Sequence, residues 1–176
     1  ASTFHAARST PPYLLLDAVS PHLAARRQGR LIDLERIVSW VAKLHEVGIS
    51  ISHSNYDKHT AYVLGNADMP GFSTHDQAML AAFALGHQGK LPKHMPEDTR
   101  AHWLALFCLR LAVLLCRRRE TIAELPLTLK VDNKRVLIRA SRKWLDSRPL
   151  TAYSLEGERK EWKKAGFSVA VEPVDD

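Results

Sequence analysis

The sequence is poor in cysteine and has no hydrophobic run long enough to cross a bilayer. Its two cysteines, Cys108 and Cys116, lie eight residues apart in an apolar stretch with helical spacing. This spacing does not suit a zinc finger, and we expect two buried thiols in a reducing compartment. The longest apolar run, 104–116, is interrupted by Arg110. These shortages predict a cytoplasmic protein that does not interact with a membrane.

Sequence motifs for catalysis are also missing. There is no Gly-x-Gly-x-x-Gly, no glycine-rich loop that could surround a phosphate, and no Gly-x-Ser-x-Gly nucleophile elbow. A cysteine nucleophile needs an accessible thiolate, which buried thiols do not supply. We therefore predict that no catalytic residue lies in this chain.

Positive charge exceeds negative charge. Lys and Arg number 25 and Asp and Glu number 19, which gives a formal net charge of +6. A basic surface of this kind favours polyanions such as nucleic acid, polyphosphate or anionic lipid headgroups. The alternative is a moderately basic surface that binds no partner, and charge alone does not separate the two.

Hydrophobic spacing predicts a helical region followed by a small α+β region. After Pro126 the spacing of apolar residues changes from helical to alternating. The expected helices are 32–46, 57–65, 74–87 and 97–119, with one or two short helices at 13–25. The second region is expected to hold hairpin strands at 127–132 and 136–140, a short helix at 141–146, a third strand at 150–154, a helix at 156–165 and a last strand at 167–172. The predicted fold class is therefore α+β, with a mostly helical domain, 1–122, followed by a small antiparallel α+β domain, 123–176.

Residue types at the expected helix ends and turns agree with this assignment. Gly48 follows the His45-Glu46 pair by two residues and fits the C-cap of a helix. Ser73 fits an N-cap, and Asp76 lies three residues later, as in a capping box. The pair 133–134, Asn-Lys, fits the tight turn of a hairpin.

Histidines are concentrated in the segment 45–90. His45-Glu46 followed by His53 resembles the metal-binding signature of HD-type phosphohydrolases, which hold divalent ions with imidazoles and carboxylates so that the ions activate water. That signature has His-Asp in place of His-Glu and a further His on a preceding helix. We therefore expect His45, Glu46, His53 and His87 to form an HD-like relic cluster without a bound metal. The alternative is a self-sufficient HD-type metal-dependent phosphohydrolase.

The same segment carries a family resemblance. Residues 44–77, LHEVGISISHSNYDKHTAYVLGNADMPGFSTHDQ, followed by GHQGKL at 86–91, resemble the C-terminal region of the exopolyphosphatase and guanosine pentaphosphate phosphatase (Ppx/GppA) family. That family carries a Leu-His-Glu-(Ile/Val)-Gly helix end, a Lys-His-x-x-Tyr helix and an Asn-(Ala/Ser)-Asp-(Met/Leu)-Pro-Gly-Phe loop. Several short matches in order are more specific than any one of them. The resemblance continues more loosely through Pro-Leu-Thr-Leu at 126–129 and the segment around Trp162.

The resemblance implies a helical HD-like domain and a small α+β domain that follow two actin-like domains. In the family, the actin-like domains hold the phosphate loops, Mg²⁺ and the catalytic acid. This chain is therefore expected to be inactive alone and to contain no cofactor of its own. A helical nucleic-acid binder is a weaker alternative, because no recognised reading motif supports it.

The implied function is that of a polyphosphate-binding and dimerisation region of an exopolyphosphatase. Such an enzyme releases terminal phosphate from inorganic polyphosphate, with pppGpp as an alternative substrate. The implied partners are inorganic polyphosphate, the actin-like catalytic domains and a second copy in a homodimer. No membrane and no nucleic acid are expected among the partners.

Seven basic residues are the predicted contacts for polyphosphate. They lie near expected helix ends and turns, where they would line a channel that neutralises phosphate charge in a salt-dependent way. These residues are Lys58, His59, Lys90, Lys93, Arg117, Arg118 and Arg119. The alternative for the three arginines is a solvated helix end, where positive charge is favourable without any ligand.

Overall fold

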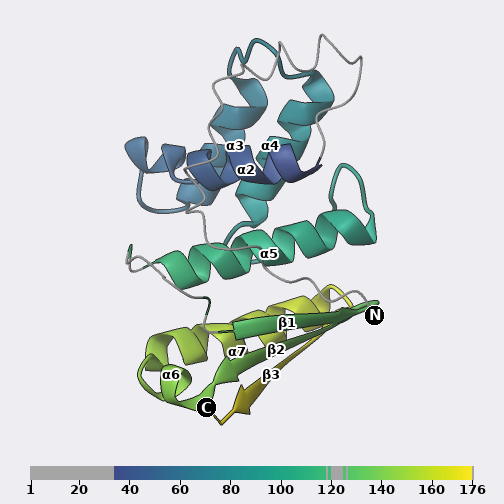
Figure 1. Ribbon diagram of the computed structural model, residues 1–176. Coiled ribbons are helices and arrows are strands. Elements are labelled where there is room, and N and C mark those ends of the chain that lie inside the picture. Colours follow the sequence, from purple (N-terminus) through teal and green to yellow (C-terminus); the bar gives the residue numbers. More distant parts are fainter. Residues whose placement is uncertain (1–33, 118, 120–124, 126, 176) are drawn as a thin grey trace. The chain divides into compact units, whose positions relative to one another are not determined.

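The computed structural model describes residues 34–117, 119, 125 and 127–175. The described residues form two compact units, 34–113 and 114–175, which we call the helical unit and the α+β unit. The division falls within helix α5 (Figure 1). The predicted domain boundary at 122/123 stays a prediction, and the short helices expected at 13–25 lie outside the described residues.

The helical unit contains the helices that apolar spacing predicts, the last of them up to residue 113, and the short helix η1, which was not predicted. They are α2 (Leu34–Leu44), η1 (Val47–Ser50), α3 (Tyr56–Asn66), α4 (Thr74–Gly86) and α5 (Arg100–Cys116). Helix α3 packs along α4, and α2 lies across them with its contacts mainly to α4 (Figure 1). The buried core includes Val41, Leu80 and Phe83, none of which has any exposed surface. Burial of these apolar side chains is the main source of the unit's stability.

Helix α5 is apolar on more than one side, and this corrects one expectation. Leu106, Phe107 and Arg110 are buried, whereas Cys108 and Cys116 are exposed. The prediction that both cysteines are buried is therefore wrong. In a helix with few polar residues, apolar spacing does not say which side faces the core. No described helix combines the length and the hydropathy needed to span a membrane.

The start of α4 is built as predicted. The backbone N–H of Asp76 donates to Ser73 Oγ at 3.1 Å, and the backbone N–H of Ser73 donates to Asp76 Oδ2 at 2.9 Å. These two bonds form the capping box and satisfy two N–H groups at the N-terminal end of α4.

Gly48 was expected to cap α2. It lies inside η1 instead. It is required by close contact with α3: a Cβ atom here would lie 2.2 Å from the carbonyl oxygen of Tyr56 and 2.5 Å from the backbone nitrogen of Thr60. The N–H of Gly48 donates to Thr60 Oγ1 at 2.9 Å, and this hydroxyl donates to the carbonyl oxygen of His45 at 2.9 Å. The residue after α2 is thereby fixed to the middle of α3.

The α+β unit contains a three-stranded sheet and two helices. Its elements are β1 (Leu127–Asp132), β2 (Arg135–Ser141), α6 (Arg142–Asp146), α7 (Pro149–Lys164) and β3 (Ser168–Val174). Strands β1 and β2 form an antiparallel hairpin from the pair Leu127–Ala140 to the pair Asp132–Arg135. Asn133 turns the chain with a φ of 50°, as its sequence suggests. The predicted hairpin, the short helix before Ser147 and the α+β class are confirmed.

Two details of the α+β prediction are wrong. The expected third strand, 150–154, belongs to α7, a 16-residue helix with Pro149 in its first turn. Strand β3 pairs with β2 in parallel, from Arg135–Ser168 to Ser141–Val174, so the sheet is mixed with the order β1-β2-β3. The cause is the connection: a long helix returns the chain to the end of the sheet where β2 begins, and a strand that starts there runs parallel to β2.

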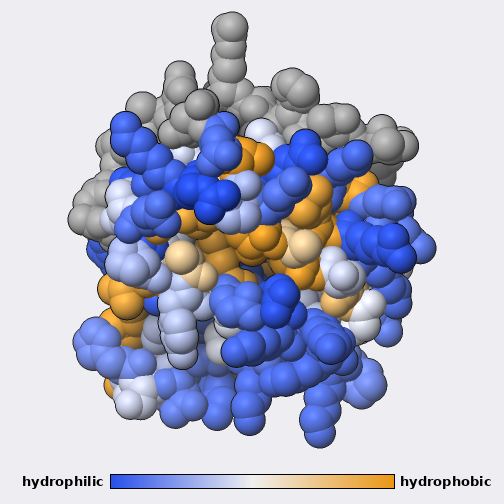
Figure 2. Space-filling view, turned by 90° about the horizontal axis from the view of Figure 1, so that it is seen from below, coloured by the Kyte–Doolittle hydropathy of each residue, from blue (hydrophilic) through white to orange (hydrophobic). Residues whose placement is uncertain are grey.

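The core of the α+β unit lies between α7 and one face of the sheet (Figure 1). Trp162 and Ile138 have no exposed surface, and the Trp162 ring meets the edge of Phe167 at a centroid distance of 5.4 Å. Seen from below, hydrophilic residues cover much of the surface and some hydrophobic residues reach it (Figure 2). Leu150 and Tyr153 of α7 are 81% and 80% exposed.

Candidate functional site

A cluster of rings lies where η1, α3 and the end of α4 meet. His87 follows α4 directly and is 1% exposed. Its ring centroid lies 5.1 Å from that of His45 and 5.4 Å from that of Tyr56. The structure therefore brings together two of the four predicted cluster residues, His45 and His87. It adds Tyr56, which had not been predicted.

The hydrogen bonds of these side chains define their tautomers. His87 Nδ1 faces the carbonyl oxygen of Ala84 and must donate to it, so the proton of a neutral ring lies on Nδ1. His87 Nε2 lies 3.4 Å from the Tyr56 hydroxyl. That hydroxyl donates to Gln88 Oε1 at 3.0 Å. His45 Nδ1 donates to the carbonyl oxygen of Ala42 at 2.9 Å.

Burial lowers the pKa of His87 to about 4. The hydrogen bond to Ala84 and the charge of Asp57 act in the opposite direction, whereas the charges of His45 and Arg110 lower the pKa further. His87 is therefore uncharged at neutral pH. It supplies a fixed ring and an unprotonated nitrogen beside Tyr56 and does not supply positive charge for an anion.

The other two predicted cluster residues, Glu46 and His53, lie at exposed positions. Within residues 34–117 and 127–175, no three His, Cys, Asp or Glu side chains are arranged so that they could hold a metal ion. The described residues therefore do not provide the ligand set that the HD-type metal-hydrolase alternative requires. Proximity of all four residues stays a prediction.

The segment after α4 carries two predicted phosphate contacts, Lys90 and Lys93, and both are exposed. Its start is attached to α5 by Arg110, a residue that is only 3% exposed. Arg110 donates from Nη1 to the carbonyl oxygen of Gly86 at 2.6 Å and from Nη2 to that of Gly89 at 2.8 Å. The sequence analysis did not assign Arg110 to the site. Its position inside the longest apolar run could have indicated a buried arginine, and a buried arginine needs hydrogen-bond partners.

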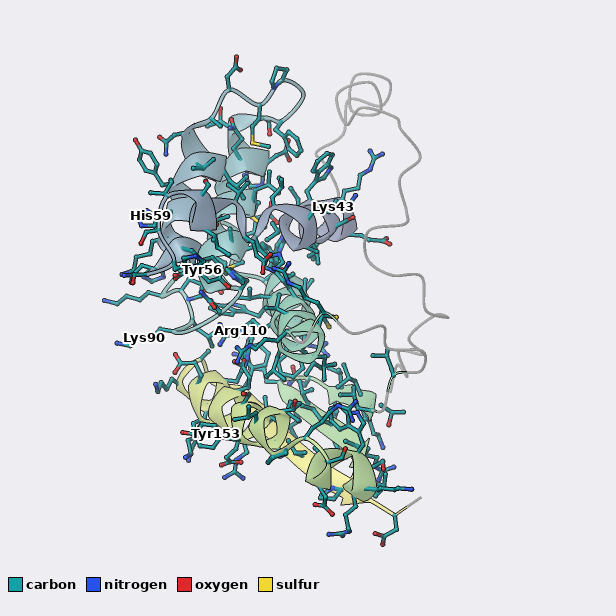
Figure 3. The ribbon with its side chains drawn as sticks, turned by 90° about the vertical axis from the view of Figure 1, so that its left-hand side faces the viewer. Lys43, Tyr56, His59, Lys90, Arg110 and Tyr153 are labelled. Atoms are coloured by element: carbon teal, nitrogen blue, oxygen red, sulfur yellow. The ribbon has the colours of Figure 1, made fainter. Side chains whose placement is uncertain are left out.

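The first turns of α3 carry two more predicted contacts. Lys58 is exposed and His59 is half-buried. Figure 3 shows His59, Tyr56 and Lys90 on the same side of the helical unit, with Lys43 on the opposite side. Among the described residues, none of the three lysines at 58, 90 and 93 forms an ion pair with a carboxylate. Lys90, on this side of the unit, is therefore an exposed lysine without an ion-pair partner among the described residues.

The predicted arginine contacts belong to the other unit. Arg117 and Arg119 are exposed, and Arg119, three residues after the end of α5, has a φ of 54°. Arg118 lies outside the described residues. Whether these arginines act together with the lysines of the helical unit stays a prediction.

Comparison with known proteins finds a family match over most of the chain. The family model described as Ppx/GppA phosphatase, domain III, matches residues 14–159. The guanosine-5′-triphosphate,3′-diphosphate pyrophosphatase of Pseudoalteromonas translucida (strain TAC 125) is 37% identical over 142 residues, which cover 77% of this chain and 28% of that protein. The protein of the same name from Vibrio parahaemolyticus serotype O3:K6 is 30% identical over 162 residues, with coverages of 90% and 31%. That of Vibrio campbellii is 28% identical over 180 residues, with coverages of 93% and 36%. The chain thus spans about a third of the length of these relatives.

Proposed function

The chain belongs to the Ppx/GppA phosphatase family as its domain III, and from this premise we propose that it binds a linear chain of phosphates for a phosphatase whose catalytic domains lie outside this sequence. The part of each relative that this chain covers, 28–36%, leaves room for those domains. Mg²⁺ would act in the catalytic domains. The residues described here would guide or hold the part of the substrate that is not being cleaved.

The observation that carries the proposal is that His59 and Lys90 lie on one side of the helical unit (Figure 3), with exposed Lys58 and Lys93 close to them in the sequence. Lys58 and His59 come from the first turns of α3, and Lys90 and Lys93 come from the segment that follows α4. The backbone on which Lys90 is carried is tied to α5 through Arg110. A fixed backbone lowers the entropy lost when the lysines order around an anion.

Net charge does not explain binding by this unit, because residues 34–113 contain as many acidic as basic residues. The basic residues are Arg36, Lys43, Lys58, Lys90, Lys93, Arg100 and Arg110, and the acidic residues are Glu35, Glu46, Asp57, Asp68, Asp76, Glu97 and Asp98. Any attraction for an anion must therefore come from local separation of charge. In this proposal the exposed lysines Lys58, Lys90 and Lys93 supply that local charge, since a polyanion responds to nearby charges within about 10 Å at ordinary salt.

The ligand class that fits is a row of phosphates joined by anhydride bonds. Inorganic polyphosphate has this chemistry, and so does the 5′-triphosphate of the nucleotide in the names of the relatives. Flexible lysine side chains suit such a ligand because each ammonium can follow a different phosphate without a fixed angle. We propose that the full-length protein releases terminal phosphate from one or both of these substrates, as a homodimer.

Titration of fluorescently labelled long-chain polyphosphate tests the proposal. Wild-type chain is compared with a Lys90→Glu, Lys93→Glu variant and with a Lys43→Glu control, whose lysine lies on the opposite side of the unit. The double variant removes two charges and adds two repulsive ones, so we expect affinity to fall at least tenfold, since exposed pairs contribute roughly 1 kcal/mol each. Lys43→Glu is expected to change affinity less than threefold, about what one distant, screened charge contributes. Equal losses in both variants would refute a localised binding surface.

A parallel titration with guanosine-5′-triphosphate,3′-diphosphate separates the two ligand sources. If binding depends only on the phosphate row, both ligands lose affinity in the Lys90→Glu, Lys93→Glu variant. Binding of the nucleotide alone, with no measurable affinity for polyphosphate, would narrow the proposal to the nucleotide. Absence of binding by the wild-type chain to either ligand at low salt would refute it.

A further inference from the structure

One uncharged polar side chain, that of Gln88, is hydrogen-bonded to Tyr56, which lies on the proposed phosphate-binding side (Figure 3). Gln88 is half-buried and lies between the buried ring of His87 and Gly89, two residues before Lys90. The backbone on both sides of it is fixed, because Arg110 binds the carbonyl oxygens of Gly86 and Gly89. The backbone of Gln88 therefore has a defined position, just before the residues Lys90 and Lys93.

The orientation of the Gln88 amide is set by Tyr56. The Tyr56 hydroxyl donates to Gln88 Oε1 at 3.0 Å. His87 Nε2 is also an acceptor but lies at 3.4 Å, and of these two acceptors the nearer, Gln88 Oε1, receives the hydroxyl proton. With Oε1 turned toward Tyr56, the NH₂ end of the amide is turned away from it. The two amide hydrogens are then donors that a ligand on this side can use.

Tyr56 itself is held by the ring cluster. Its ring packs against that of the buried His87 at a centroid distance of 5.4 Å, and His87 packs in turn against His45. Figure 3 shows Tyr56 on the side of the unit that also carries His59 and Lys90. The buried, uncharged rings thus hold the Tyr56 hydroxyl that orients the half-buried amide of Gln88.

We propose that Gln88 is a phosphate-binding residue, that its amide NH₂ donates to a phosphoryl oxygen of the bound phosphate chain, and that Tyr56 is its positioning residue. This inference rests on the proposed function and adds a different kind of contact. A lysine attracts a phosphate from several ångströms away in any direction, whereas an amide donates along a fixed direction at hydrogen-bond distance. Gln88 would therefore fix the register of the phosphate chain on a surface that otherwise attracts it without fixed geometry.

The salt dependence of binding distinguishes the two kinds of contact. Loss of one cation that neutralises a phosphate lowers the slope of log K against log salt by about 0.7–0.9, because one fewer counterion is released. Loss of an uncharged hydrogen bond lowers affinity equally at every salt concentration and leaves the slope unchanged. Gln88→Met keeps the length of the side chain and removes both donors, so it is the matched variant.

The experiment titrates labelled polyphosphate into wild-type chain, Gln88→Met, Tyr56→Phe, the double variant and Lys90→Met at several salt concentrations. We expect Gln88→Met to lower affinity by about ten- to a hundredfold, the net contribution of one hydrogen bond to a charged group, with the wild-type slope. Lys90→Met is expected to lower both affinity and slope. Tyr56→Phe should weaken binding with no change in slope, and the double variant should be no weaker than Gln88→Met, because the two residues act through one contact.

Each outcome of this experiment supports or contradicts the roles proposed for Gln88 and Tyr56. Unchanged affinity in Gln88→Met, while the lysine variants lose affinity, would overturn this inference and leave the proposed function standing. A reduced slope in Gln88→Met would mean that the substitution had displaced a lysine, and it would also overturn the inference. Unchanged binding in Tyr56→Phe would remove the positioning role. Absence of binding by the wild-type chain would overturn both proposals. Thermal unfolding of each variant confirms that it is folded at the temperature of titration.

Discussion

Arg110 Nη1 donates to the carbonyl oxygen of Gly86 at 2.6 Å and joins the middle of α5 to the last residue of α4. The last four carbonyl groups of a helix have no partner within the helix, and positive charge is favourable beside them. A second bond from the same guanidinium to Gly89 extends this support into the following segment. The bond to Gly86 is therefore a helix cap supplied by a distant residue, and it fixes the backbone that carries Gln88 and Lys90.

Replacement of Arg110 by Leu is expected to lower the free energy of unfolding by about 2–4 kcal/mol, because it leaves the carbonyl oxygens of Gly86 and Gly89 without their donor. Arg110→Lys retains the charge but cannot reach two carbonyls with a planar fork, so an intermediate loss is expected. Urea denaturation measures both, with Lys93→Leu as the exposed control. A loss no larger than that of the control would show that water replaces the guanidinium at little cost.

Two glycine substitutions are expected to change stability in opposite directions. Gly48→Ala places a Cβ atom 2.2 Å from a backbone oxygen of α3, so we expect a loss of more than about 2 kcal/mol through displacement of η1. Gly157→Ala lies in α7 with nothing within 4 Å of the new Cβ, so a gain of about 0.5–1 kcal/mol is expected. Chemical denaturation of both variants checks the pair. A tolerated Gly48→Ala would mean that η1 is not held against α3 as described.

The lowered pKa of His87 makes stability depend on pH. The folded value is about 4 and the ordinary value is 6.5, so between these two values the unfolded chain binds more protons than the folded chain. This contribution is fully present above pH 6.5 and is lost as pH falls toward 4. Between pH 7 and pH 5 it amounts to about 2 kcal/mol by linkage. His45, Asp57 and Arg110 are the charged or titratable groups that act on the ring.

The measurement compares unfolding free energies of wild-type chain and His87→Gln at pH 7 and pH 5. Carboxylates contribute to both proteins, so the difference between the two pH dependences isolates His87. We expect the variant to lose less stability than wild type over this interval, whatever its stability at pH 7. Equal pH dependences would show that His87 takes up its proton without unfolding the cluster.

Two leucines of α7 differ in exposure, and we expect their replacement to differ in its effect on stability. Leu155 is 1% exposed, whereas Leu150 is 81% exposed. Leu155→Ala is therefore expected to lower the free energy of unfolding by about 2–5 kcal/mol, and Leu150→Ala by less than about 0.5 kcal/mol. Thermal or urea unfolding distinguishes them. Comparable losses would support burial of both leucines and would contradict the orientation of the helix described here.

Local sequence signals predicted most of the elements because their causes are local. Helical spacing identified α2 to α5, Ser73 and Asp76 identified the start of α4, and Asn133 identified the hairpin turn. Gly48 shows where such reasoning fails: a glycine after a helix can be a cap or a point of close contact, and the second depends on a residue of α3. The parallel pairing of β3 likewise depends on the path of α6 and α7, which no short segment encodes.

The candidate site was predictable only in part for the same reason. Charge identified Lys58 and Lys90 as surface residues, and the family resemblance, now supported by the match to domain III, indicated the segment from His45 to Lys90. The bond between Tyr56 and Gln88 joins residues 32 positions apart and leaves no pattern in the sequence. This bond could be found only from the structure, in which α3 packs against the end of α4.

The parallel pairing of β2 with β3 has a consequence for synthesis on the ribosome. The hairpin β1–β2 can form early, but the other edge of β2 stays without its partner until residue 174 has left the exit tunnel. Until that point the nascent chain presents an open strand edge, and such edges promote aggregation.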